Sequence, residues 1–152
     1  MLIYFILGIV VISIIIYLLN RGKKNNEKLN SYQEKCENGC GSDPNCINGK
    51  WDVSVGGHCM YPVRKKDDYQ FETGKEYSLS SNITNFGGQV ESEEECIKTC
   101  TDSPSYCVAG SYDKTDKTCR VGTVEFTQNA CKYVETNSNP EAVFFKSKIL
   151  CN

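Results

Sequence analysis

Residues 91–122 read "ESEEECIKTCTDSPSYCVAGSYDKTDKTCRVG", and these residues carry the clearest structural signals of the cysteine-rich part of the chain. It opens with a helix signal, because Ser92 is a good N-cap residue and Glu95, three positions later, completes a capping box. The segment "TDSPS" ends the helix, since Pro104 cannot continue it. The sequence therefore predicts a short helix that begins after Ser92 and stops before Pro104.

Two strands are expected after this helix. The letters "YCVAGSY" alternate as in a half-buried strand, "DKTDK" is turn chemistry, and "TCRVGTV" reads as the returning strand. Cys96 and Cys100 lie four residues apart and so share one face of the helix. We expect that face to pack on the hairpin that carries Cys107 and Cys119.

This arrangement resembles the PAN/apple module, a family with two helical cysteines four apart, a third at the start of a strand and a fourth on the next strand. The words "GSYDKTDKTC" carry the likeness most directly. The resemblance covers about residues 88–124, and residues 59–151 if the outer strands belong to it. It implies ligands that are proteins or sugars, but it fixes no binding residue.

Disulfides are expected throughout this part of the chain, since ten cysteines make an even number and the polar remainder cannot build a large core. The resemblance implies the pairs Cys96–Cys119 and Cys100–Cys107. It also suggests that Cys59 and Cys151 tie the ends of the domain together. Residue spacing alone leaves the full connectivity open. The disulfide candidates are Cys36, Cys40, Cys46, Cys59, Cys96, Cys100, Cys107, Cys119, Cys131 and Cys151.

The N-terminal nineteen residues form a separate segment. Residues 1–19 carry no charged side chain and are long enough to predict a transmembrane helix. Residues 20–35 are a polar, basic stalk that either extends that helix or runs as a tether. The basic flank Arg21, Lys23 and Lys24 favours a cytosolic position for everything that follows.

The expected fold class is α+β: a single N-terminal transmembrane helix, then a small disulfide-rich domain with one main helix on short antiparallel strands. Residues 36–58 form a cysteine-rich loop region, and residues 59–152 form the PAN-like domain. Within these we expect a strand around Trp51, Val53 and Val55, strands at "YQFET" and "KEYSLS", and a loop at "NFGGQ".

The sequence argues against several kinds of site. Zinc could use four of a group of five residues, but that group has no CxxC pair. "DKTDKT" lacks the glycine and the final glutamate of a calcium loop. The chain offers no catalytic set, so neither an enzyme nor a metal or cofactor is predicted, and a small-molecule substrate is not expected. The candidate zinc ligands are Cys36, Cys40, Cys46, His58 and Cys59.

Charge also limits the partners. The formal net charge is -2, from 17 basic and 19 acidic residues, which gives no basic stripe for nucleic acid. A lipid membrane and protein partners are expected instead. Surface aromatic residues are candidates for protein contact, although core packing explains them equally well. These aromatic candidates are Tyr61, Tyr69, Phe71, Phe144 and Phe145.

The basic flank and the cysteines point to different compartments, because the cytosol keeps thiols reduced. The layout resembles anchored virion proteins of large DNA viruses, some of which form disulfides on the cytosolic side. The leading hypothesis is therefore a virion membrane protein, a minor capsid or anchor component that tethers the internal membrane to capsid proteins. The alternative is a type II cell-surface or secretory-pathway PAN-like module binding protein or carbohydrate, for which Asn82 in "NIT" is a glycosylation candidate.

Overall fold

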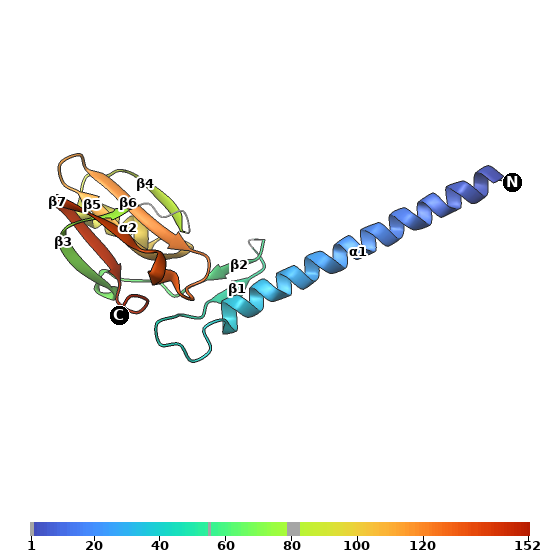
Figure 1. The fold of residues 1–152 in the computed structure, drawn as a ribbon, viewed down its shortest axis with the longest axis horizontal. Coiled ribbons are helices and arrows are strands. Elements are labelled where there is room, and N and C mark those ends of the chain that lie inside the picture. Colours follow the sequence, from blue (N-terminus) through green and yellow to red (C-terminus); the bar gives the residue numbers. More distant parts are fainter. Residues whose placement is uncertain (1, 55, 79–82) are drawn as a thin grey trace. The chain divides into compact units, whose positions relative to one another are not determined.

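The computed structural model describes residues 2–54, 56–78 and 83–152, which form two compact units (Figure 1). The first unit is Met1–Glu34 and the second is Lys35–Asn152. Asn82, the glycosylation candidate, and Val55 lie outside the described residues. The second unit contains the sheet and all ten cysteines.

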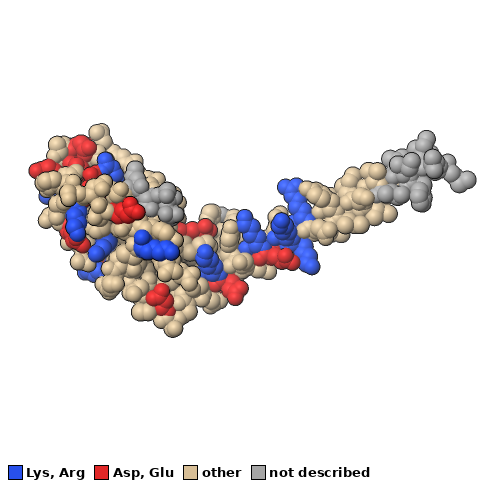
Figure 2. All heavy atoms as spheres, viewed as in Figure 1, with Lys and Arg blue, Asp and Glu red and all other residues tan. Residues whose placement is uncertain are grey.

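Helix α1, Leu2–Asn38, runs without a break through the segment predicted as a stalk. The stalk sequence has no proline, and one glycine, Gly22, is tolerated in a helix. Arg21, Lys23 and Lys24 are exposed, and Figure 2 shows lysine and arginine side chains gathered along a stretch of this helix. Of the two alternatives left open for residues 20–35, the structure has the continuous helix.

The prediction of a transmembrane helix over residues 1–19 is wrong. Among the helices of the described residues, none is both long enough and apolar enough to cross a membrane. The apolar run is not a separate element that ends at residue 19. It is the first part of a 37-residue helix whose second part carries charges of both signs from Arg21 to Glu37.

A five-stranded antiparallel sheet forms the body of the second unit, in the order β3-β7-β5-β6-β4. Its central strand β5 is buried from Tyr106 to Tyr112 without alternation, as expected of a strand covered on both faces. The strands are β3 Tyr69–Ser78, β4 Thr84–Gln89, β5 Tyr106–Asp113, β6 Thr118–Val124 and β7 Glu135–Ser147. The predicted hairpin of "YCVAGSY" and "TCRVGTV" is β5 and β6.

Helix α2, Glu93–Thr101, packs on one face of this sheet. The predicted cap is present, because the Ser92 side chain accepts a hydrogen bond from the Glu95 amide at 3.2 Å. The Glu95 carboxylate accepts a hydrogen bond from the backbone amide of Glu91 at 2.9 Å, and not from the amide of the cap residue Ser92 as in a standard capping box. Beyond the other end of the helix, the buried Arg64 donates to the carbonyl oxygens of Thr101 and Ser103.

A second apolar cluster covers the opposite face of the sheet. Phe144 and Phe145 follow one another along β7, so their rings point to opposite faces. Phe145 packs with α2, whereas Phe144 packs with Tyr77 and Val108. The sheet is therefore the middle layer of the core, with α2 on one side only.

Five disulfides hold the second unit together. Cys96–Cys119 and Cys100–Cys107 are both present, as the family resemblance implied, and they join α2 to β6 and β5. The suggested link between Cys59 and Cys151 is wrong. Cys151 pairs with Cys131, and Cys59 pairs with Cys36 at the end of α1. The remaining pair is Cys40–Cys46.

Three strand predictions also need correction. The expected loop "NFGGQ" is strand β4, because register with β6 overrides the turn preference of its two glycines. "YQFET" and the described part of "KEYSLS", which ends at Ser78, join as one strand, β3, with a bulge at Gly74, where φ is +79°. Leu79 and Ser80 lie outside the described residues. The strand around Trp51 is only β1, Lys50–Asp52, which pairs with β2, His58–Met60.

The N-terminal cysteine loop docks on the domain through the buried side chain of Thr127. Its hydroxyl oxygen accepts a hydrogen bond from the Ile47 amide at 2.9 Å and donates to the Ile47 carbonyl at 2.5 Å. One side chain thus satisfies both backbone groups of a residue 80 positions away. Residues 36–58 thus lie in the same compact unit as the sheet.

Replacing this hydroxyl tests the docking. We expect Thr127→Val to lower the free energy of unfolding by about 1–3 kcal/mol, because it leaves the Ile47 amide and carbonyl without their partner. Thr127→Ser, which keeps the hydroxyl, is the control and should unfold nearly as wild type. Urea denaturation under oxidising conditions measures both, and equal stability of the two variants would contradict the assigned role.

Candidate functional site

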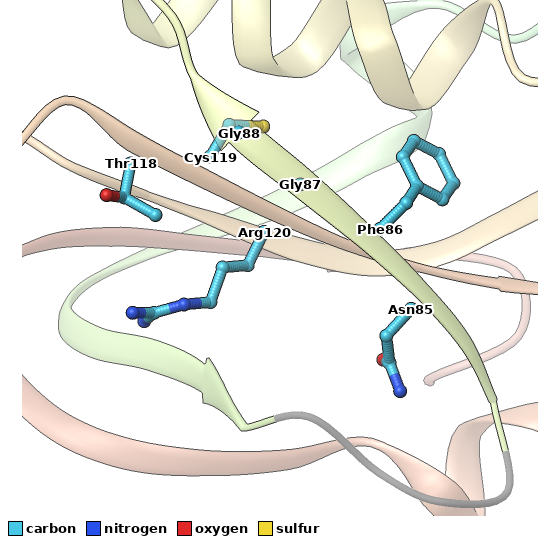
Figure 3. A pocket seen from close by; sticks show the side chains of 7 residues that line it. All are labelled: Asn85, Phe86, Gly87, Gly88, Thr118, Cys119 and Arg120. Carbon is cyan, nitrogen blue, oxygen red and sulfur yellow. The ribbon is translucent and has the colours of Figure 1, made fainter.

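A hollow of about 320 Å3 lies over β4 and its neighbour β6, at the edge of the sheet (Figure 3). Two consecutive glycines, Gly87 and Gly88, have no side chains to cover the main chain of β4 here, so its backbone atoms line the hollow. The hollow is lined by Asn85, Phe86, Gly87, Gly88, Thr118, Cys119 and Arg120.

The two glycines differ in what surrounds them. A Cβ atom on Gly87 would collide with the backbone carbonyl oxygen of Cys119 and lie 3.2 Å from the Cα atom of Arg120. A Cβ atom on Gly88 would meet nothing within 4 Å. Close packing of β4 on β6 therefore requires glycine at 87, while the space beside Gly88 is open for an incoming group.

Side chains of the site lie on both sides of β4. In Figure 3 the ring of Phe86 points away from the side chains of Asn85 and Arg120, as alternation along a strand requires. Phe86 is 37% exposed, which is a large exposed fraction for an aromatic residue in a sheet. The site thus offers an apolar ring on one side of the strand and polar groups on the other.

Arg120 is held in place by a network of polar side chains. Its guanidinium pairs with Glu76. The Asn139 amide donates to Glu76 at 3.3 Å and to the Asp113 carboxylate at 2.6 Å. Hydrogen bonds from Asn139 and the Thr115 amide lower the pKa of Asp113, so this carboxylate keeps its charge. Arg120 accordingly presents a fixed cationic donor at the hollow.

The outer edge of β4 carries backbone groups that no described strand pairs with, because β4 is the last strand of the sheet. The Val90 amide donates to the Lys117 carbonyl at 2.9 Å, which shows which residues face β6. Antiparallel alternation then directs the backbone amide and carbonyl groups of Phe86 and Gly88 toward β6. The same groups of Gly87 and Gln89 point outward, away from the sheet. The edge ends at Gln89 and includes neither a charged residue nor a proline.

The other edge of the sheet, β3, is protected in the usual way. It carries charged side chains, and Glu72 makes ion pairs with Lys75 at 2.6 Å and with Lys146 at 3.3 Å. The hydrogen bond from Lys75 lowers the pKa of Glu72, which therefore stays ionised. The bulge at Gly74 further disrupts pairing with another strand. Of the two edges, β4 is the one that is ready to pair.

The aromatic residues suggested as contact candidates are mostly in the core. Tyr69, Phe144 and Phe145 are buried, and burial raises the pKa of Tyr69, whose hydroxyl donates to the Cys107 carbonyl at 3.0 Å. Tyr61 and Phe71 are partly buried and pack against core clusters. The exposed ring that borders the hollow, Phe86, lies in the segment predicted as a loop and was missed.

The alternative zinc ligands are not available in this structure. The four cysteines of that group are in the disulfides Cys36–Cys59 and Cys40–Cys46, and His58 is exposed on β2. The segment "DKTDK" is a turn in which Asp113 and Asp116 accept hydrogen bonds from backbone amides at 2.8 and 2.9 Å.

The fold and site define a class of protein: a small disulfide-stapled α+β domain with one uncharged sheet edge beside a hollow. The family model of the PAN domain matches residues 59–147, and the chain belongs to this family. The match includes α2, the whole sheet and the hollow. No curated protein sequence matches the chain.

The two glycines allow a paired test of this geometry. We expect Gly87→Ala to lower the free energy of unfolding by about 1–3 kcal/mol, because backbone atoms of β6 would have to move. Gly88→Ala should leave stability within about 0.5 kcal/mol of wild type, since its methyl group enters open space. Thermal and urea unfolding of the oxidised chains measure both changes, and the reverse order would show that the strands pack differently.

Proposed function

We propose that the chain is a binding protein whose PAN domain holds a protein partner along the outer edge of β4 and in the adjoining hollow. The observation that carries this proposal is the uncharged outer edge at Gly87 and Gln89, beyond which the structure describes no further strand. An extended segment added to such an edge gains affinity from main-chain hydrogen bonds and specificity from pockets for its side chains. The open space beside Gly88 is such a pocket.

Carbohydrate is the second candidate ligand, in keeping with what the family resemblance implies. The observation that favours it is the polar side of the hollow, where Asn85, Thr118 and the fixed guanidinium of Arg120 provide hydrogen-bonding groups for sugar hydroxyls. Asn85 is itself held in place, since its side chain accepts from the Tyr77 hydroxyl at 2.8 Å. A sugar would use these side chains and leave the main-chain edge unpaired.

Five disulfides support a place of maturation where thiols are oxidised. We accordingly propose the cell surface or secretory pathway as the location, and protein or carbohydrate rather than nucleic acid or small-molecule substrates as partners. The virion internal membrane, the capsid partners and the lack of enzymatic activity remain predictions from the sequence.

Backbone hydrogen exchange of the full oxidised chain separates the two ligand classes. With an uncharged, alternating Thr-Val hexapeptide at about ten times its Kd, we expect the amides of Gly87 and Gln89 to exchange about tenfold more slowly. The amides of Phe86 and Gly88, which face β6, serve as the internal reference. Saccharide panels should instead perturb the side-chain signals of Thr118 and Arg120.

Thr118→Ala is the matched variant, because it removes a hydroxyl group from the polar side of the hollow and keeps the backbone edge of β4. It should weaken saccharide binding and retain pairing with the hexapeptide. If neither peptide nor saccharide alters any signal of β4 or β6, the proposed site is wrong.

A further inference from the structure

We infer that the peptide bond between Lys65 and Lys66 is a processing site for a trypsin-class serine endoprotease. One cut there leaves α1 and the five-stranded sheet without a covalent connection. This site goes beyond the proposed function, because it uses neither the edge of β4 nor the hollow. The grouping of the disulfides, the exposure of the link and the residue types at the bond support it.

The five disulfides fall into two groups along the chain. Two of them lie within residues 36–59, and the other three lie within residues 96–151. All ten cysteines are paired in this way, so no disulfide bridges the two groups. Residues 60–95 are therefore the single covalent connection between them, and one broken peptide bond in this segment divides the chain into two pieces.

The link from Tyr61 to Lys65 makes this connection accessible. These five described residues belong to no helix or strand, and Pro62, Val63 and Lys65 are exposed. Val63, with 89% of its surface exposed, is the most open of the large apolar residues that the structure describes. Lys75, another basic residue of the connection, lies inside β3, where it is paired with β7.

Lys65 has the residue type and the backbone form that a trypsin-class protease requires. Its backbone is extended, with φ -125° and ψ 162°, and its side chain is exposed. Such a protease binds an extended segment, and a carboxylate in its specificity pocket pairs with the lysine of the substrate. Lys66 begins the short 3-10 helix Lys66–Asp68, so the bond before it is the one presented in extended form.

Cleavage is a hydrolysis that needs only the protease and water. The bond between the Lys65 carbonyl carbon and the Lys66 nitrogen breaks. Water supplies the hydroxyl group of the new carboxyl end at Lys65, and its remaining proton goes to the Lys66 nitrogen, which becomes a new α-amino group.

Two short-range hydrogen bonds hold this bond in the intact chain. The Asp68 amide donates to the Lys65 carbonyl at 3.0 Å, and the Lys65 amide donates to the Asp68 carboxylate at 2.7 Å. Both close within four residues of the chain, so they can open without disturbing the sheet.

Arg64 controls how readily the link reaches a protease. It is buried, and its guanidinium donates to the carbonyl oxygens of Thr101 and Ser103 and lies 5.0 Å from the centroid of the Tyr106 ring. Because Arg64 directly precedes Lys65, this side chain must leave the domain before a protease can enclose the bond. The cleavage rate should therefore follow local opening at Arg64 rather than global unfolding.

Limited digestion of the full oxidised chain with trypsin, followed by mass spectrometry, tests the inference. The chain is kept in a non-ionic detergent, because apolar side chains are exposed along α1 from Val10 to Leu19. We expect a product that begins at Lys66 and separates from residues 1–65 on a denaturing gel without reductant.

Two variants address the bond and its control. Lys65→Gln should abolish the product that begins at Lys66, because it removes the lysine that the protease binds. Arg64→Met should form this product roughly ten- to a hundredfold faster, because hydrogen bonds from a buried charged group are lost.

Lys114→Gln is the matched control, because it removes an exposed lysine from the turn between β5 and β6. It should leave formation of the product that begins at Lys66 unchanged. In Arg64→Met, the rate of cleavage after Lys114 should stay at its wild-type value, which distinguishes local opening of the link from a general loss of structure.

Two results would overturn the inference. If trypsin yields no product that begins at Lys66, the link is not a processing site, whether or not other bonds are cut. If Arg64→Met speeds cleavage after Lys65 and after Lys114 alike, the substitution loosens the whole domain and Arg64 does not control the link. The peptide and saccharide tests of β4 use the uncut chain, so either result leaves the proposed function unaffected.

Discussion

The structure depends on the covalent attachment of a very short helix to a hairpin. Helix α2 has nine residues, and an isolated helix of that length is marginal in water. Cys96 and Cys100 lie on its inner face, fully buried, and bind to Cys119 and Cys107 on the two strands beneath. These two bonds define the face of the sheet that α2 covers. Neither bond involves β4, the strand beyond β6, which forms an edge of the sheet.

A thin core is supplemented by buried polar contacts that tie distant segments together. Arg64 lies with its guanidinium over the Tyr106 ring, 5.0 Å from the centroid, and bonds the carbonyl groups at the end of α2. Thr127 does the same for the loop at Ile47. Each contact satisfies backbone groups that helix and sheet leave over, which is where a small domain would otherwise lose stability.

The sequence was most informative where chemistry is local. The cap at Ser92, the stop at Pro104, the turn at Asp113 and the hairpin could all be predicted, because each depends on residues close in the chain. The strand at Gly87 could not be predicted, because its partner β6 overrides the turn preference of two glycines. The role of Arg64 was equally hidden, since its partners lie 37 and 39 positions away. The transmembrane prediction failed because the apolar run is only the first part of a 37-residue helix, whose second part is charged.

The Cys36–Cys59 bond has a mechanical consequence. It joins the last turn of α1 to β2, and it closes a loop with a sequence separation of 23. A pulling force applied along α1 would pass through the sulfur atoms into β2, and the residues between would carry no load. Once this bond is reduced and Ile47 is pulled from Thr127, the chain gains about 60 Å of contour length, taking about 3.4 Å for each extended residue and leaving out the loop that Cys40–Cys46 keeps closed. The redox state of a single pair thus sets how far the domain can extend from its helix under load.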